Sequence, residues 1–216
     1  MIEAMIHVLR TGCPWRDLPS QFGPWSSVYT RFRRWSQAGL WAQILDLITE
    51  RAHGNLRFLD ATHIKVHQDA ANPAGGQHLQ AFGRTKGGLN TKLTVTVDSK
   101  GKVLQATLAP GQRGDAIAAE EIIFMEGERI VADRGFDSDH IRSRIDRAGG
   151  TPCIPPRSNR NNPRPYSRVS YRKRHHVENF FQRIKTFRRV ATRYDKLAET
   201  YFGWLLLGTV VKFGTI

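Results

Sequence analysis

The chain has 216 residues, of which 40% are hydrophobic and 10% aromatic, a composition that excludes a disordered tail or a fibre. Its 33 Lys and Arg against 19 Asp and Glu give a formal net charge of +14, which favours polyanionic partners, nucleic acid first. Two cysteines without CxxC spacing exclude a disulfide framework, and the most apolar stretch, residues 201–213, falls short of the roughly 20 residues that cross a bilayer, so we expect a cytoplasmic protein without a membrane partner.

The first part of the chain is predicted to be helical. It lacks the alternation of apolar and polar residues that is typical of β-strands. Gly and Pro separate three segments with helical periodicity, residues 2–10, 26–37 and 40–53. The second of these segments carries a cluster of three arginines, Arg31, Arg33 and Arg34. Two interpretations stay open: a packed bundle with a solvated basic rim, or a helix-turn-helix-like unit that lays arginines on DNA phosphates.

From residue 54 onward short apolar runs alternate with turn residues. They predict strands over residues 56–66, 89–97, 103–108, 129–132 and 152–155. Helices are expected over residues 115–124, 138–148, from 171 onward and over 201–213. This order is typical of an α/β sheet. We therefore divide the chain into a helical region, residues 1–53, and an α/β domain, residues 54–216.

Two aspartates follow apolar runs of this second part. Asp60 follows residues 56–59 and Asp133 follows residues 130–132, which places each at or near the carboxyl end of a buried strand. If the two strands are neighbours, both carboxylates open into the same crevice. Taken singly, an aspartate after a strand is more often a turn former or a helix cap.

A third acidic residue lies on the helix that begins near residue 171. At 100° per residue, one face of this helix carries Tyr171, Arg174, Glu178 and Lys185. The other face is a stripe that points to the core, formed by Val177, Phe180, Ile184 and Phe187. On its own the polar face is equally that of a solvated helix with a weak Arg174–Glu178 pair.

Taken together, three carboxylates on separate elements of a strongly basic chain predict a metal site. Clustered acids repel one another unless a cation neutralises them. Oxygen ligands without a thiolate select Mg²⁺ or Mn²⁺. Two such ions promote the attack of a water or a 3′-hydroxyl on a phosphodiester. Near the predicted hairpin, Arg84 and Lys92 are expected to lie beside backbone phosphate.

Several segments carry a family resemblance. They are FLDATHIKVH at 58–67, GRTKGGLNTK at 83–92, VADRGFD at 131–137 and YRKRHHVE at 171–178. With these and similar stretches at 9–19 and 188–196, the chain resembles bacterial insertion-sequence transposases of the DDE type, in the insertion-sequence-five group of the insertion-sequence-four-like superfamily. That family's signature around its third acid is Tyr, two residues, Arg, three residues, Glu, six residues, Lys, and it is filled by Tyr171, Arg174, Glu178 and Lys185.

The resemblance implies a ribonuclease-H-like mixed sheet flanked by helices, with a small all-α region before it. It implies that two Mg²⁺ ions are bound by Asp60, Asp133 and Glu178. Such an enzyme cuts at the 3′ ends of the element and joins them to target DNA. By the same analogy, phosphates near the transposon end are contacted by Tyr171, Arg174 and Lys185. The implied partners are double-stranded DNA, as terminal inverted repeats and target, and a second copy of the chain, at the bacterial nucleoid.

Two further interpretations stay open. Family members usually carry some tens of residues before the part that corresponds to Met1, so the first is an N-terminally truncated, catalytically inactive remnant that only binds DNA. The second is a structural RNA-binding protein with a basic surface, which needs no clustered acids. Cleavage of DNA that depends on the three acids separates the transposase from both.

Overall fold

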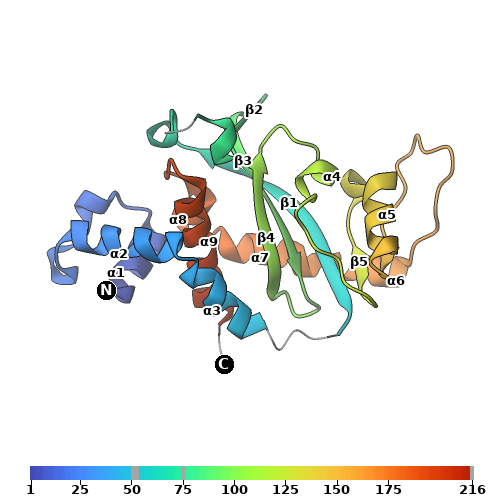
Figure 1. Ribbon diagram of the computed structural model, residues 1–216, viewed down its shortest axis with the longest axis horizontal. Coiled ribbons are helices and arrows are strands. Elements are labelled where there is room, and N and C mark those ends of the chain that lie inside the picture. Colours follow the sequence, from blue (N-terminus) through green and yellow to red (C-terminus); the bar gives the residue numbers. More distant parts are fainter. Residues whose placement is uncertain (50–53, 74–75, 215–216) are drawn as a thin grey trace.

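The computed structural model describes residues 1–49, 54–73 and 76–214 (Figure 1). Its first part holds the three helices that the sequence predicts, α1 (Ile2–Thr11), α2 (Trp25–Gln37) and α3 (Leu40–Thr49). The predicted extension of the third helix to residue 53, and the proposed boundary after it, lie outside the described residues. Helix α1 ends at Gly12, whose φ of +72° favours glycine and where a Cβ would collide with Arg188.

One mixed sheet forms the second part. Among the described residues its strands are β1 (Leu56–Val66), β2 (Gly83–Thr85), β3 (Gly88–Val97), β4 (Val103–Pro110), β5 (Arg129–Val131), β6 (Thr151–Cys153) and β7 (Thr192–Arg193). Strand β1 is antiparallel to β3 and parallel to β5, β4 extends the sheet beside β3, and β6 extends it beside β5. The order β4-β3-β1-β5-β6 is that of the ribonuclease-H-like sheet, and the predicted fold class is confirmed.

The remaining helices are α4 (Asp115–Ala118), α5 (Asp139–Arg147), α6 (Arg168–Tyr171), α7 (His175–Ile184), α8 (Arg188–Ala191) and α9 (Ala198–Phe213). The predicted helix over residues 115–124 is wrong beyond Ala118. Gln105 on β4 explains the difference, because its side-chain amide donates to the Ile123 carbonyl at 2.7 Å and accepts from the Ile123 N–H at 2.8 Å. These bonds replace those that a helix would supply.

Hydrophobic side chains cover both faces of the sheet. On β1, Phe58 and Ile64 point into the larger cluster, beneath α7 and α9, while Leu59 points into a second cluster beneath α5. Helix α9 lies between the N-terminal helices and the sheet (Figure 1). Its Trp204 is fully buried and stacks on Phe32 of α2, with ring centroids 3.8 Å apart. The two parts of the chain therefore share one core.

Helix α9 is apolar along its length, and its buried side chains include Tyr201, Trp204 and Leu205. Across the described ranges, no helix combines the length and the apolar character that a membrane span requires.

Candidate active site

The first two acids come from neighbouring strands. Phe58 of β1 lies opposite Val131 of the parallel strand β5. Asp60 and Asp133 each follow two residues later, so their side chains emerge beside each other on one face. The strands are neighbours, as the prediction required. Asp60 does not end its strand, however: β1 continues to Val66, because these residues pair with β3.

A tight turn orients Asp133. Its Oδ1 accepts the Gly135 N–H at 2.7 Å, which begins the 3₁₀ turn at Arg134–Phe136. A Cβ on Gly135 would collide with the carboxylates of Asp133 and Asp115. A fourth acid, Asp115 at the start of α4, therefore lies beside the turn. The sequence analysis placed Asp115 only at the start of a predicted helix, residues 115–124.

Lys92 supports this fourth acid. Its ammonium is 2.6 Å from Asp115 Oδ1 and 2.5 Å from the carbonyl oxygen of Arg113. The residue is 5% exposed. This burial corrects the prediction that Lys92 lies beside a DNA phosphate. The ammonium lies inside the protein, because Asp115 and a carbonyl compensate its lost hydration. Lys92 is better described as a residue that positions α4.

The third acid, Glu178, lies in the first turn of α7 and is half-exposed. The helix predicted to run continuously from residue 171 is interrupted: α6 ends at Tyr171, and a 3₁₀ turn over Arg172–Arg174 precedes α7. The predicted core stripe is nevertheless buried, at Val177, Phe180, Ile184 and Phe187. Burial of this stripe fixes the direction in which Glu178 points.

Arg174 joins the three acids. Its Nη2 lies 2.7 Å from Asp60 Oδ2 and 3.9 Å from Asp133 Oδ2, and its Nη1 lies 3.7 Å from Glu178 Oε1. The three predicted acids therefore converge around one guanidinium. In this arrangement the described part of the chain has no group of three His, Cys, Asp or Glu side chains placed to hold a metal ion. The cation at the centre is Arg174.

The charges of this centre are coupled. Burial raises the pKa of the Asp60 carboxyl above its ordinary value, and the charge and hydrogen bond of Arg174 oppose that rise. Burial by itself would lower the pKa of the Arg174 guanidinium, but the Asp60 carboxylate outweighs burial and raises this pKa. Arg174 Nε is buried and has no hydrogen-bond partner among the described residues. The guanidinium is thus held by its acids rather than by a complete set of hydrogen bonds.

The remaining predicted residues lie at different distances from the acids. Tyr171 lines a surface pocket of about 320 Å³ together with Asp133 and Arg174. Lys185 donates to Thr62 Oγ1 at 2.7 Å, two residues beyond Asp60 on the same face of β1, and burial lowers its pKa. Arg84 is exposed on β2 opposite Leu89, whereas Asp60 lies opposite Val95. Arg84 therefore does not belong to the acidic centre.

Two residues beside the acids escaped sequence reasoning. Arg134 and Tyr166 line the same pocket as Tyr171. Arg134 carries a signal, since it follows Asp133 directly in a turn. Tyr166 carries none, because it lies in a loop without regular structure and reaches the site through its edge-on contact with Tyr171, at 5.5 Å between ring centroids.

The loop after Asp133 is anchored by a buried ion pair. Asp137 Oδ1 accepts from Arg142 Nε at 2.8 Å, and Asp137 Oδ2 accepts the Arg157 N–H at 2.7 Å. Although burial acts upward, these bonds lower the pKa of Asp137 below its ordinary value of 3.8. The stabilisation is therefore present above pH 3.8 and is lost as the pH falls through the lower value in the folded protein.

We expect Asp137→Asn to lower the free energy of unfolding at pH 7 by about 3 kcal/mol, because it leaves the buried Arg142 without its counter-ion. Urea denaturation at pH 7 and pH 3 measures the effect, and the difference between wild type and variant should shrink at the lower pH. Asp139→Asn is the control, since that side chain is 79% exposed. The same large difference at both pH values would contradict this account.

Known protein families match both parts of the chain. Residues 52–211 match the family "Transposase DDE domain", and residues 1–45 match the family "Putative transposase of IS4/5 family". The chain belongs to the DDE transposases of insertion sequences, as its sequence motifs predicted, and its first 45 residues are similar to the IS4/5 family.

Similar proteins occur in bacteria. The chain is 30% identical over 122 residues to the "Putative transposase for insertion sequence element IS6501" of Brucella ovis, a match that covers 55% of this chain and 94% of that protein. It is 39% identical over 49 residues to the "Insertion element IS402 uncharacterized 16.2 kDa protein" of Burkholderia cepacia, which covers 22% of this chain and 33% of that protein.

Two solved structures resemble the fold. The catalytic core domain of BIV integrase aligns with a TM-score of 0.43 and 15% identity, over 76% of this chain and 87% of that one. The piggyBac transposase in a synaptic complex with hairpin DNA aligns with a TM-score of 0.47 and 10% identity, over 74% of this chain and 47% of that one.

Proposed function

We propose that this transposase cuts DNA at the 3′ ends of its insertion sequence and joins those ends to target DNA by metal-dependent phosphoryl transfer. The observation that carries the proposal is the convergence of Asp60, Asp133 and Glu178 on one guanidinium. Asp60 lies on a strand, Asp133 in the turn after a second strand and Glu178 on a helix, and the fold brings these distant parts of the sequence to one point.

The donor set fits a divalent cation. Three carboxylates supply hard oxygen ligands, the type that Mg²⁺ and Mn²⁺ prefer. Arg174 already offsets their mutual repulsion, which is the task of a bound cation. We assign two ions to Asp60, Asp133 and Glu178. When bound, they would lower the pKa of the attacking water or 3′-hydroxyl and stabilise the leaving oxygen.

The basic residues around the acids bind DNA in this proposal. Arg174 leaves the carboxylates and takes a backbone phosphate, for which its planar guanidinium is suited. Tyr171, Lys185 and the exposed Arg134 hold neighbouring phosphates. Pairing two element ends requires two active sites, so we propose a homodimer on DNA. We place it on the chromosome in the bacterial cytoplasm, where the net charge of +14 favours association with DNA.

A cleavage assay tests the proposal. The full chain is incubated with duplex DNA that carries the terminal repeats flanking its own gene, in Mg²⁺, in Mn²⁺ or in EDTA, together with a plasmid target. We expect new 3′-hydroxyl ends at the repeat boundary, and their transfer to the plasmid, only when metal is present. Salt-sensitive binding without cleavage in either metal would instead identify an inactive DNA-binding remnant.

Replacement of Arg174 gives a second test that does not depend on turnover. Because the guanidinium competes with a cation for the same oxygens, Arg174→Gln should bind Mn²⁺ about tenfold more tightly than wild type in the absence of DNA. Hydrogen bonds to charged groups contribute about 1.5–3 kcal/mol, and about 1.4 kcal/mol corresponds to tenfold. Electron paramagnetic resonance of free Mn²⁺ measures the affinity. Arg172→Gln, an exposed neighbour, is the control, and equal affinity in Arg174→Gln and wild type would contradict the competition.

A further inference from the structure

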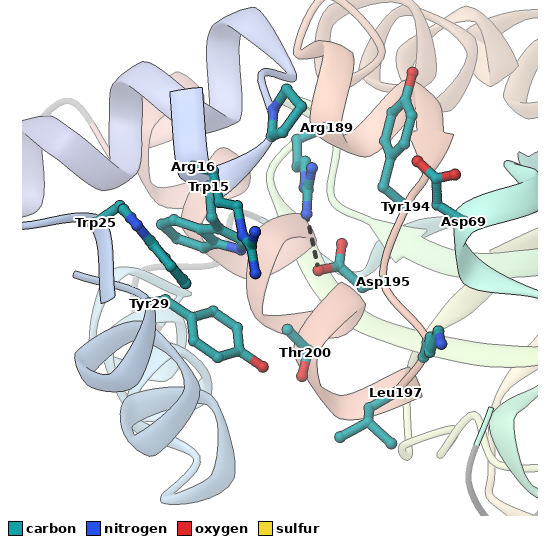
Figure 2. A pocket seen from close by; sticks show the side chains of 12 residues that line it. Trp15, Arg16, Trp25, Tyr29, Asp69, Arg189, Tyr194, Asp195, Leu197 and Thr200 are labelled. Carbon is teal, nitrogen blue, oxygen red and sulfur yellow. Dashed lines mark hydrogen bonds and ion pairs between the residues drawn. The ribbon is translucent and has the colours of Figure 1, made fainter. Parts of the chain in front are cut away.

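A second pocket, with a volume of about 430 Å³, lies between the N-terminal helices and the C-terminal part of the chain (Figure 2). Asp60, Asp133 and Glu178 do not line it. Its walls come from the turn at Trp15–Asp17 and α2 on one side, and from α8, the segment after β7 and α9 on the other. Its size is in the range of ligand sites that take a small planar molecule.

One wall of this pocket is aromatic. It is formed by Trp15, Trp25 and Tyr29, and Figure 2 shows these rings across the pocket from Asp195 and Thr200. Trp15 is anchored in the core, 5.4 Å from Trp204 between ring centroids, and meets Tyr29 edge-on at 5.5 Å. Trp25 is 37% exposed. Exposed and anchored rings of this kind provide a surface on which a flat, unsaturated ligand stacks.

The opposite wall is charged and incompletely bonded. Arg189 Nη2 lies 3.2 Å from Asp195 Oδ1, and the two side chains are 7% and 6% exposed. The second carboxylate oxygen, Asp195 Oδ2, and Arg189 Nε are buried without a hydrogen-bond partner among the described residues. A buried carboxylate oxygen without a donor is costly. This wall therefore offers an acceptor to a ligand that brings its own N–H group.

Positive charge surrounds the opening. Arg16 and Lys196 line the pocket and are exposed, and the Arg16 guanidinium lies 5.7 Å from the centre of the Trp25 ring. The exposed Asp69 also lines the pocket, and its Oδ2 lies 3.2 Å from His67 Nδ1. Two cations beside a stacking surface suit a ligand whose flat ring is attached to phosphates.

We infer that this pocket binds one nucleobase turned out of a bound DNA duplex. The base stacks on Trp25 and Tyr29 and donates an amino N–H to Asp195 Oδ2, while the adjacent phosphates lie on Arg16 and Lys196. A carboxylate accepts from the amino group of cytosine, adenine or guanine, and thymine has no such group. The inference rests on the proposed function in one respect, because it requires that the chain binds DNA. It does not require that the chain cleaves DNA.

Duplexes that differ by one unpaired central nucleotide test the inference. Fluorescence anisotropy compares binding of the full chain to a perfect duplex, to one with an extra cytosine and to one with an extra thymine. We expect wild type to bind the cytosine duplex about tenfold more tightly than the perfect duplex, as base–aromatic stacking provides. Thymine should gain less.

Variants separate the two walls. Trp25→Ala should abolish the preference for the unpaired base, and Trp25→Phe should restore part of it. Asp195→Asn should remove the preference for cytosine over thymine and retain stacking. Met125→Ala is the control, because Met125 is a large exposed apolar side chain that does not line the pocket. Circular dichroism confirms that each variant is folded, and quenching of 2-aminopurine at the unpaired position reports stacking independently.

The outcomes are distinct. Equal affinity of folded wild type for perfect and unpaired duplexes overturns the inference, even if cleavage occurs. A retained preference in Asp133→Asn, which should not cleave, supports the pocket independently of catalysis. Binding of free deoxycytidine monophosphate as tight as that of the unpaired duplex would assign the pocket to free nucleotides and overturn the DNA ligand. Absence of all duplex binding would overturn both proposals.

Discussion

Asp133→Asn is expected to slow metal-dependent strand cleavage by about a thousandfold or more. Metal-ion catalysis supplies several kcal/mol of transition-state stabilisation, and about 1.4 kcal/mol corresponds to tenfold in rate. Asn keeps the size of the side chain and one acceptor oxygen for the Gly135 N–H, so the turn should persist while the charge is lost. Asp60→Asn and Glu178→Gln should have similar effects. Single-turnover cleavage of duplexes with the element's ends measures the loss.

Matched controls use acids away from the centre. Asp139→Asn and Glu120→Gln remove exposed carboxylates of the same kinds and should leave the cleavage rate unchanged. DNA affinity without metal should stay close to that of wild type in all three site variants. A site variant that retained more than about a tenth of the wild-type rate would remove its residue from the catalytic centre.

The second large effect concerns stability. Arg193→Met should lower the free energy of unfolding by about 3–5 kcal/mol. Arg193 is fully buried, and burial lowers its pKa to about 10. Its guanidinium donates to the carbonyl oxygens of Gln80, Asp195 and Lys196 and to Thr91 Oγ1, at 2.8 to 3.2 Å. Methionine fills much of the space but leaves these acceptors without donors.

Urea denaturation followed by circular dichroism measures this difference. Arg188→Met is the control, because Arg188 is exposed at the start of α8 and its replacement removes the same charge from the surface. A loss of less than about 1 kcal/mol in Arg193→Met would mean that water replaces the guanidinium, and the network would then not be a structural centre.

Much of the fold could be predicted because its signals are periodic. The apolar run of residues 56–66 predicted β1 with its observed bounds, and the helical spacing of Val177, Phe180 and Ile184 predicted the buried side of α7. The expectation that Asp60 lies at or near the carboxyl end of its strand was wrong, although the predicted bounds already placed this residue inside β1. Strands β2 and β7 are too short to produce a pattern.

Burial of charged groups was the main failure of sequence reasoning. Lys92 was expected beside a backbone phosphate near the predicted hairpin, and only the folded chain brings Asp115 to it. The three acids were predicted from motif spacing. The contacts of Arg174 with all of them depend on the 3₁₀ turn before α7, which the local sequence does not predict. The aromatic pocket joins residues separated by most of the chain and has no local signal at all.

The stacking of Trp204 on Phe32 allows tryptophan fluorescence to report on the contact between α9 and the N-terminal helices. All five tryptophans of the chain are Trp15, Trp25, Trp35, Trp41 and Trp204, and four of them belong to the helices and turns that close over α9. Indole emission should therefore shift to longer wavelength when these helices separate from α9, even while the strands of the sheet stay paired. Intrinsic fluorescence can therefore detect separation of the N-terminal helices from the rest of the chain without an added dye.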